Sequence, residues 1–411
     1  MDRFTIAERE LNLKQAEQRI HAELDSLGLS VDTRTLGRQI VAVHVSVSVT
    51  DPHRTARGSG KGYPQHARVG ALYETLEHYL SDSFNTSDIH YVAPRYFSNT
   101  PLFADDTVLA HIVKQPNTLT GCRTYTSALN KTSFSYPVAL STPGYSRQTP
   151  EQDTTNYGAL QRYASNSGTA IGASYNEAVL HAANECIERD ALSLFLLKHF
   201  YYEVHPPLRR IARMSPQDAL GRLWLDAETE IGAEIVLVDI STEFLARTFL
   251  AFSTAPCAQP RVFGTGCSIS ARHGAWRALT ELVQLHHSTS EPEFRDYLNN
   301  AQRHLTKFPR LLRCLRFDLY SLLNLCEQQT VTLPASPAEP PLAEQIGILA
   351  EDLHRHGRTL GIAQLHQTEL GTTLVNVVIP GLERFFVVSS GNVVIPQARG
   401  RRLENRQGVP V

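Results

Sequence analysis

Residues 165–191 read SNSGTAIGASYNEAVLHAANECIERDA, a glycine-bearing loop followed by a long helix predicted over about 174–198. The helix carries Glu185 and Glu188, and just over half of its other positions are apolar: alanine, valine, leucine, isoleucine, phenylalanine or cysteine. Positions i and i+3 share one helix face, so both carboxylates can point at one place. Such an apolar helix should be largely buried, and buried carboxylates are costly unless they are paired or bind a metal. The segment therefore predicts a buried ionic site.

Two further segments repeat this arrangement of glycines followed by a helix with a polar pair. Residues 58–80, GSGKGYPQHARVGALYETLEHYL, carry Glu74 and Glu77, and residues 264–285, GTGCSISARHGAWRALTELVQL, carry Glu281 and Gln284. A glycine loop at a helix N-terminus exposes backbone N–H groups and a partial positive charge, which suit a phosphate. Carboxylates beside a phosphate need a divalent cation between them, and Mg²⁺ prefers oxygen ligands. The three segments together predict one nucleotide–Mg²⁺ site.

Basic side chains accompany the acidic pairs. Lys61 lies between two glycines, Arg189 follows Glu188, and Arg277 lies one turn before Glu281. An ammonium or a guanidinium in these places can bind phosphate oxygens. Each also has a purely structural interpretation: a solvated turn lysine, an internal Glu–Arg ion pair, or a polar stripe on a partly exposed helix.

The composition narrows the class of protein. The chain has 411 residues, 19% charged residues and a formal net charge of −2, so no global field attracts nucleic acid or a membrane surface. Its six cysteines show no C-x-x-C pair and no metal-finger spacing. The two inside the glycine–helix segments, Cys186 and Cys267, are expected to be small packing residues rather than disulfide partners. The start lacks the apolar region of a secretory signal and no apolar run could span a bilayer. We expect a cytoplasmic protein with no membrane segment.

The P-loop and kinase motifs are absent from the sequence, so the nucleotide-binding folds that carry these motifs are not supported.

Helices and strands alternate along the chain, which predicts the α/β (α+β) class with a mixed sheet. We expect one domain over 1–411, with an N-terminal helical extension (1–39), a catalytic core (40–390) and a flexible C-terminal tail (391–411). A proline-rich surface loop is expected at 330–341. Outside the three segments, the predicted helices are 4–27 and 342–356, and the predicted strands are 40–49, 234–241, 247–255, 360–368, 373–379 and 384–388.

The three segments resemble the signatures of the YcaO family. The second resembles a Ser/Asn/Gly-rich loop followed by G-x-x-x-x-E-A and E-x-x-E-R-D-A. The first resembles G-K-G followed by E-x-x-E-R, with His78 in place of the arginine, and the third resembles G-x-G-C followed by R-A-L-x-E-x-x-Q. VDIS at 238–241 and VVIPGLE at 377–383 resemble two further landmarks. Ala173 stands where the family usually has a nucleotide-binding asparagine, and the chain ends in Val-Pro-Val rather than a Pro-x-Pro-x-Pro run.

The resemblance implies a YcaO-like fold and an ATP- and Mg²⁺-dependent cyclodehydratase. In that chemistry a Cys, Ser or Thr side chain of a precursor peptide attacks the preceding amide, ATP phosphorylates the amide oxygen, and phosphate leaves to give a thiazoline or oxazoline. The resemblance implies Mg²⁺ ligands at Glu74, Glu77, Glu185 and Glu188. It implies ATP contacts at Lys61, Glu177, Arg189, Arg277, Glu281 and Gln284.

The same resemblance implies partner proteins. Little sequence precedes the first signature, so we expect a separate E1-like protein to bind the leader peptide of the precursor. A flavin-dependent dehydrogenase would oxidise azolines to azoles, in a hetero-oligomeric complex similar to the microcin B17 synthetase. The alternatives are thioamide or amidine formation by the same ATP activation, and a non-catalytic scaffold, which Ala173 and His78 suggest.

Overall fold

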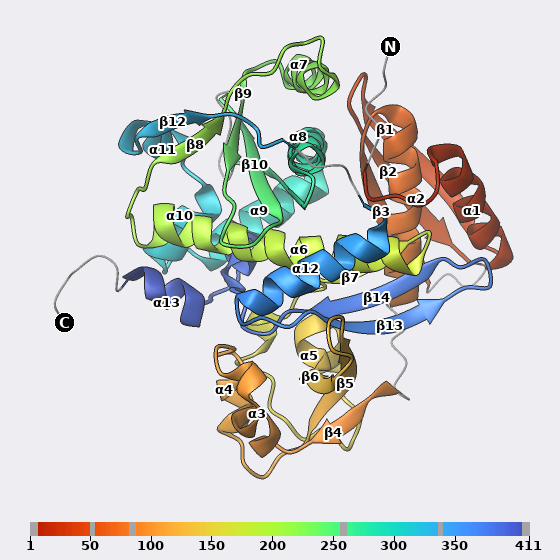
Figure 1. Ribbon diagram of the computed structural model, residues 1–411, viewed down its shortest axis with the longest axis vertical. Coiled ribbons are helices and arrows are strands. Elements are labelled where there is room, and N and C mark those ends of the chain that lie inside the picture. Colours follow the sequence, from red (N-terminus) through yellow and green to blue (C-terminus); the bar gives the residue numbers. More distant parts are fainter. Residues whose placement is uncertain (1–6, 50–53, 82–87, 255–260, 336–339, 405–411) are drawn as a thin grey trace.

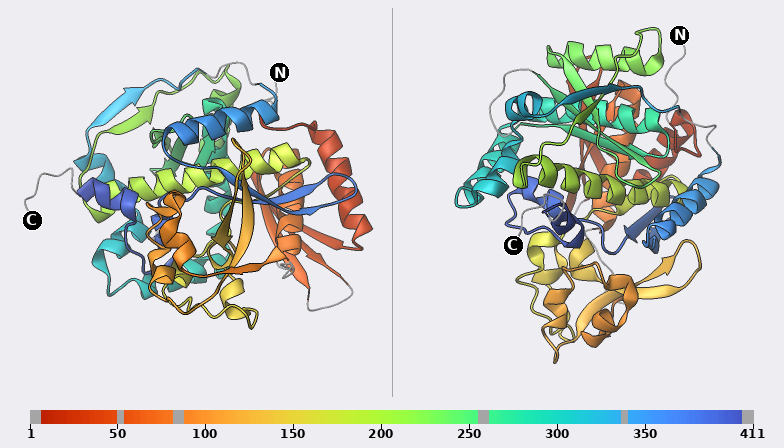
Figure 2. Two further views of the ribbon diagram at one scale, coloured as in Figure 1. Left: turned by 60° about the horizontal axis from the view of Figure 1, so that its bottom comes forward. Right: turned by 60° about the vertical axis from the view of Figure 1, so that its left-hand side comes forward.

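The computed structural model describes residues 7–49, 54–81, 88–254, 261–335 and 340–404, and it confirms the α/β class. Three β-sheets and their helices are arranged around one long helix, α6 (Tyr175–Leu196), which runs through the middle of the molecule (Figures 1 and 2). Among the described residues, no helix has both the length and the apolarity needed to cross a lipid bilayer.

The first sheet is antiparallel in the order β1-β2-β3, and α1 and α2 pack against it. The valines of β2 alternate with polar residues, so one face of the strand is buried, as the period-two pattern predicts. The bounds are α1 (Leu13–Ser26), β1 (Ser30–Gly37), β2 (Val41–Ser48), β3 (Thr55–Gly62) and α2 (Pro64–Ser81).

The second sheet has the order β11-β10-β9-β8-β12, with β8 and β12 parallel and the other neighbours antiparallel. Helices α7 and α8 share an apolar core with one face of this sheet, and α6 packs on the other face. The bounds are β8 (Leu208–Ile211), α7 (Ala219–Ile231), β9 (Ile235–Asp239), β10 (Arg247–Ser253), β11 (Gly264–Ser268), α8 (Ala271–Ser288), α9 (Pro292–His304), α10 (Pro309–Arg316), α11 (Leu319–Leu325) and β12 (Gln328–Val331).

The third sheet has the order β4-β5-β13-β14-β7, and β6 pairs with β5. Because α6 and α12 pack on this sheet, α6 lies between the second and third sheets and contributes to the cores on both sides. The bounds are β4 (His90–Val92), α3 (Arg95–Asn99), α4 (Ala110–Val113), β5 (Thr120–Ser127), β6 (Ser133–Pro137), α5 (Val138–Ser141), β7 (Thr169–Gly172), α12 (Leu342–Arg355), β13 (Gly361–Gln367), β14 (Thr373–Val378) and α13 (Ala398–Glu404).

Several local predictions were wrong. The N-terminal region is not only helical, because β1 occupies its second half, and the helix predicted at 4–27 begins at Leu13. The strand predicted at 384–388 is a 3₁₀ helix, Phe385–Ser390. The loop predicted at 330–341 begins inside β12, whose side chains are mostly exposed and therefore carry no apolar pattern.

The tail was expected to be flexible from residue 391, yet its described part, residues 391–404, packs on the core. Arg399 of α13 is 9% exposed and forms an ion pair with the fully buried Asp190 of α6 at 2.8 Å. The backbone N–H groups of Gln397 and Gly400 donate to the buried Glu383 carboxylate. These contacts link residues far apart in the sequence, so no local pattern predicted them. Residues 405–411, with the Val-Pro-Val end, lie outside the described residues.

Candidate functional site

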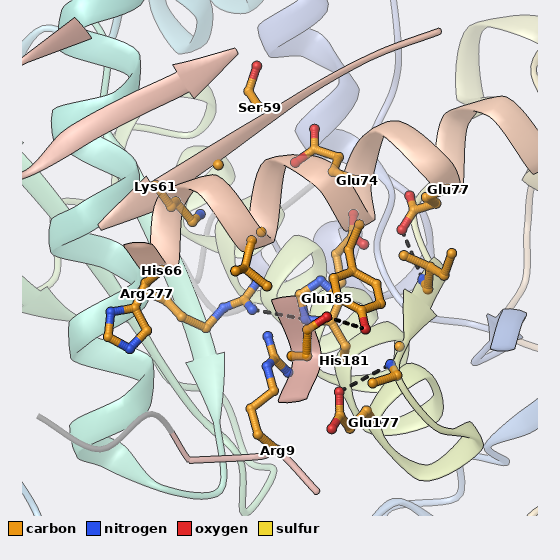
Figure 3. A pocket seen from close by; sticks show the side chains of 18 of the residues that line it. Arg9, Ser59, Lys61, His66, Glu74, Glu77, Glu177, His181, Glu185 and Arg277 are labelled. Carbon is orange, nitrogen blue, oxygen red and sulfur yellow. Dashed lines mark hydrogen bonds between the residues drawn. The ribbon is translucent and has the colours of Figure 1, made fainter. Parts of the chain in front are cut away.

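One cavity of about 740 Å³ is lined by α2, α6, α8, the end of β3 and the N-terminal segment (Figure 3). The structure places all ten predicted site residues on its wall, although they span more than 220 positions of the chain. These are Lys61, Glu74, Glu77, Glu177, Glu185, Glu188, Arg189, Arg277, Glu281 and Gln284. Their individual roles remain predictions.

Most of these glycines, such as Gly60 and Gly266, lie in strands rather than in the loops that we expected, whereas Gly168 lies in a turn with a φ of 85°. A side-chain carbon on Gly60 in β3 would lie 1.7 Å from the Ala67 carbonyl oxygen of α2. One on Gly266 in β11 would lie 2.2 Å from the Gly274 carbonyl oxygen of α8. Here glycine lets a helix lie directly against its preceding strand. The role we inferred for these glycines, cradling phosphate, therefore gives way to a packing role that sets where each helix lies.

Side chains alternate along a strand, so Lys61 points to the opposite face of β3 from Gly60. There it forms an ion pair with Glu281 of α8. The Lys61 side chain is only 20% exposed, so it is not the solvated turn lysine of the structural alternative. Strand β3 thus lies between α2 and α8 and brings a cation to the cavity.

Four carboxylates from two helices converge in the cavity. Glu74 and Glu77 come from α2, and Glu185 and Glu188 come from α6. Glu77 accepts a hydrogen bond from the Ile171 N–H at 3.0 Å. Glu188 is 2% exposed; its Oε1 accepts from a threonine hydroxyl, whereas its Oε2 is buried and has no hydrogen-bond partner within the described part of the chain.

Burial raises the pKa of Glu74, Glu77 and Glu185, and for Glu77 the negative charges of the other two raise it well above the usual value. Carboxylates that disfavour one another's ionisation are typical of a site that binds a divalent cation, since the cation would reverse the effect. An all-oxygen donor set and the orphaned Glu188 oxygen fit Mg²⁺.

Two guanidinium groups border the carboxylates. Arg189 lies 3.6 Å from Glu185 and 4.0 Å from Glu188, so the internal ion pair that the sequence left open is present. Its Nε is buried without a hydrogen-bond partner among the described residues, which leaves a donor for a ligand. Arg277 Nη1 lies 2.9 Å from His181 Nδ1. Burial, with the Arg277 charge, holds the pKa of His181 well below its usual value, so this imidazole is neutral and accepts the hydrogen bond.

Glu281 differs from the other acidic groups. Burial raises the pKa of its carboxyl, but the positive charges of Lys61 and Arg189 outweigh burial and leave the pKa below its usual value. This carboxylate is therefore ionised and holds Lys61 in place. The cavity therefore brings carboxylates and cationic side chains together on one wall, and a metal-bound polyphosphate needs both kinds of group.

The N-terminal segment ahead of α1 lies across the cavity, which the sequence did not predict. The Glu177 carboxylate accepts hydrogen bonds from the backbone N–H groups of Glu10 and Leu11, at 2.7 and 3.3 Å. Glu8 is buried and accepts from Asn184 at 3.1 Å, while Arg9 lines the cavity. Glu177 was expected to complete the nucleotide pocket. In the structure its carboxylate also holds the N-terminal segment through these two hydrogen bonds. No local pattern indicates contacts between residues some 170 positions apart.

A comparison with family profiles shows a match to "YcaO cyclodehydratase, ATP- and Mg²⁺-binding" over residues 59–383, which is most of the chain. A curated relative, from Rhizobium leguminosarum bv. trifolii, is described as an uncharacterized protein in the tfuA 3′ region. It is 26% identical over 234 residues. That match covers 53% of this chain and 52% of the relative, so the chain spans about half the length of the relative.

Solved structures share the fold at low sequence identity. YcaO from Methanopyrus kandleri, bound with AMPPCP and Mg²⁺, matches with a TM-score of 0.66 and 16% identity, over 94% of this chain and 95% of that one. A heterocyclase in complex with substrate and cofactor matches with a TM-score of 0.66 and 14% identity, and the match covers 92% of this chain and 54% of that one. A chain of the E. coli microcin synthetase McbBCD complex matches with a TM-score of 0.57 and 14% identity, and the match covers 87% of this chain and 88% of that one. The profile match, extending from β3 through all three strand–helix segments, shows that this chain belongs to the YcaO family, whose cofactors are ATP and Mg²⁺.

Proposed function

We propose that the protein is an ATP- and Mg²⁺-dependent cyclodehydratase that forms thiazoline or oxazoline rings in a ribosomally made precursor peptide. The observation that supports the proposal is the convergence of Glu74, Glu77, Glu185 and Glu188 with Lys61, Arg189 and Arg277 in one cavity. Membership of a family described as ATP- and Mg²⁺-binding supports the assignment of a nucleotide and a metal to this cavity.

In this proposal, the four carboxylates of α2 and α6 hold Mg²⁺, which neutralises charge on the ATP phosphates when bound. Lys61, Arg189 and Arg277 orient the phosphates by charge-assisted hydrogen bonds. Glu281 and Gln284 complete the nucleotide pocket, and Glu177 does so while it fastens the N-terminal segment. Close packing of α2 and α8 on their preceding strands at glycine positions keeps the side chains of these helices in fixed positions.

The chemistry that this site would serve is the removal of an amide oxygen. A thiol or hydroxyl of the peptide adds to the preceding amide carbon and loses its proton. The resulting oxyanion attacks the terminal phosphorus of ATP, and ADP leaves. Phosphate then departs with the former amide oxygen as a C=N bond forms and the nitrogen loses its proton. Each ring therefore removes the atoms of one water and consumes one ATP.

The decisive experiment measures ATP hydrolysis and peptide mass with a precursor from the gene's neighbourhood. We expect ATP use that depends on the peptide and a mass loss of one water per ring. Glu188→Gln should lower the rate at least 100-fold, since a lost metal ligand removes a few kcal/mol of transition-state stabilisation. Glu344→Gln, on an exposed position of α12, is the matched control and should keep full activity.

Other outcomes identify the alternatives. A gain of mass from sulfur, with the same ATP use, would indicate thioamide formation; ring closure onto an amine would indicate amidine formation. A protein that binds the peptide but hydrolyses no ATP would be the scaffold that Ala173 and His78 suggest. Unchanged activity in Glu188→Gln would remove the metal assignment.

We further propose that the protein works in a hetero-oligomeric complex, with an E1-like protein that binds the leader and a flavin-dependent dehydrogenase. The fold similarity to the McbBCD complex supports this arrangement. Co-purification of the neighbouring gene products with the full chain tests it; recovery of the chain alone, with full activity, would contradict it.

A further inference from the structure

A second cluster of ligand-type side chains lies at the far end of the central helix. His199, His205 and Cys326 each offer one ligand atom, and these atoms lie within 4.8 Å of one another. His199 lies on a π-helical turn, Leu197–Tyr201, that continues α6. At the rise of a helix, His199 is roughly 20 Å along the axis from Glu185. The cluster is therefore separate from the nucleotide cavity, at the side of the molecule where β8, α11 and β12 lie (Figure 1).

The sheet topology explains why these residues meet. Strands β8 and β12 are parallel, with Leu208 opposite Gln328, and the Leu208 N–H donates to the Glu327 carbonyl at 2.7 Å. Parallel strands begin at the same edge of a sheet, so the residues just before each strand become neighbours. His205 is three residues before β8, and Cys326 is two residues before β12.

Segment 202–207 is held in an unusual conformation. His205 has a φ of 49°, which is uncommon for a residue with a side chain, and Glu203, at 54°, shares this feature. Two prolines follow His205 and restrict the backbone further. Arg313 of α10 fastens the segment by an ion pair with Glu203 at 2.8 Å. Such backbone strain concentrates at functional sites.

Two residues of the cluster, His199 and Cys326, are buried, and His205 is half-buried. His199 is 4% exposed, and its Nδ1 lies 3.4 Å from Cys326 Sγ. His205 Nδ1 is buried with no hydrogen-bond partner within the described ranges. A ring nitrogen of each histidine and the cysteine sulfur are the atoms by which these side chains bind metals.

We propose that His199, His205 and Cys326 bind a zinc ion. Two imidazole nitrogens and one sulfur are ligands that Zn²⁺ favours, and water would take the fourth position. The Cys326 thiol would lose its proton to the solvent as the metal binds. The metal would join the end of α6 to the β8–β12 edge of the second sheet and stabilise that edge. The proposal does not depend on the activity proposed for the nucleotide cavity.

The test uses the full chain, stripped by a chelator and then incubated with Zn²⁺ in excess Mg²⁺, which occupies carboxylate sites. We expect one zinc per chain after desalting and a higher melting temperature than for the stripped protein. Cys326→Ser and His205→Ala should lose both effects. Cys122→Ser, which alters a buried cysteine on β5, is the matched control and should keep them.

Cobalt gives a second measurement, whose main result comes from the wild-type protein. Co²⁺ bound to the wild-type protein should show the near-ultraviolet charge-transfer band of a thiolate ligand, and Cys326→Ser should lack it. Absence of this band and of retained zinc in the wild type would overturn the proposal. So would zinc retention that is unchanged in folded Cys326→Ser and His205→Ala proteins, with folding checked by circular dichroism.

Discussion

At the scale of single residues, the main feature is a group of carboxylates that the folded protein prefers to protonate. The pKa of Glu77 is raised well above 4.5 by burial and by the nearby Glu74 and Glu185. A raised pKa in the folded state means that the proton stabilises the fold. This stability is fully present below pH 4.5 and is lost as pH rises through the raised pKa.

We therefore expect the free energy of unfolding of the metal-free protein to fall as pH rises above 4.5. In Glu77→Gln, which cannot ionise at this position, the fall over the same pH range should be smaller by about 1 kcal/mol. Saturating Mg²⁺ with a nucleotide analogue should flatten the profile of the wild type, because a cation stabilises the ionised carboxylates. Thermal unfolding across pH, with and without chelator, measures this. The exposed Glu351→Gln is the control. Equal pH slopes in wild type and Glu77→Gln would count against a coupled carboxylate group.

Lys61 gives a second prediction at this scale. Its ion pair with Glu281 places its ammonium on the cavity wall, where a charge-assisted hydrogen bond to phosphate contributes about 1.5–3 kcal/mol. Lys61→Met should weaken nucleotide binding by about 10- to 100-fold. Calorimetric titration with a non-hydrolysable analogue and Mg²⁺ measures the change, and Lys114→Met, at an exposed position, should bind as the wild type does. Unchanged affinity in Lys61→Met would exclude a phosphate contact.

At the scale of elements, the repeated feature is a glycine strand in direct contact with the helix that follows it. A methyl group on Gly266 would lie within 2.2–2.6 Å of α8 backbone atoms, so α8 would have to move. Gly266→Ala should cost about 1–3 kcal/mol of stability and also weaken nucleotide binding, because Arg277, Glu281 and Gln284 move with the helix.

The matched control is Gly347→Ala in α12, where an added methyl group meets no atom within 4 Å. That substitution should stabilise the protein by about 0.5–1 kcal/mol, since alanine is the better helix former. Chemical denaturation of both variants gives the two free energies. If Gly266→Ala proved as stable as the wild type, the close strand–helix contact would not constrain the site.

At the scale of the whole molecule, the two ends of the described chain both reach α6. The N-terminal segment is fastened by Glu177, and α13 is fastened by Arg399 on Asp190. Arg399→Ala would leave Asp190 buried without its guanidinium partner, which should cost about 3–5 kcal/mol. Arg401→Ala, on an exposed position of the same helix, should cost less than about 0.5 kcal/mol. Denaturation curves compare the two; similar small losses would show that α13 does not support α6.

The sequence alone determined the local features of this protein. The apolar periodicity of α6 and the alternation along β2 come from side chains a few positions apart, so each is readable within one segment. Nine of the ten predicted site residues were proposed in the same way, from pairs at helical spacing and from nearby basic residues, whereas Glu177 was proposed only from the family resemblance. The YcaO resemblance joined these pieces, and the profile match confirmed the family.

Only the tertiary structure decided how the segments meet. It showed that the glycines pack helices onto strands, that residues 8–12 cross the cavity, that α13 is docked, and that His199, His205 and Cys326 lie together. The last three depend on contacts between residues far apart in the chain, or on the register of paired strands. The glycine contacts join residues close in sequence, but they form only because each helix folds back onto its strand. The physical reason is that periodicity records which face of an element is buried, whereas the partner that buries it is fixed only when the elements assemble.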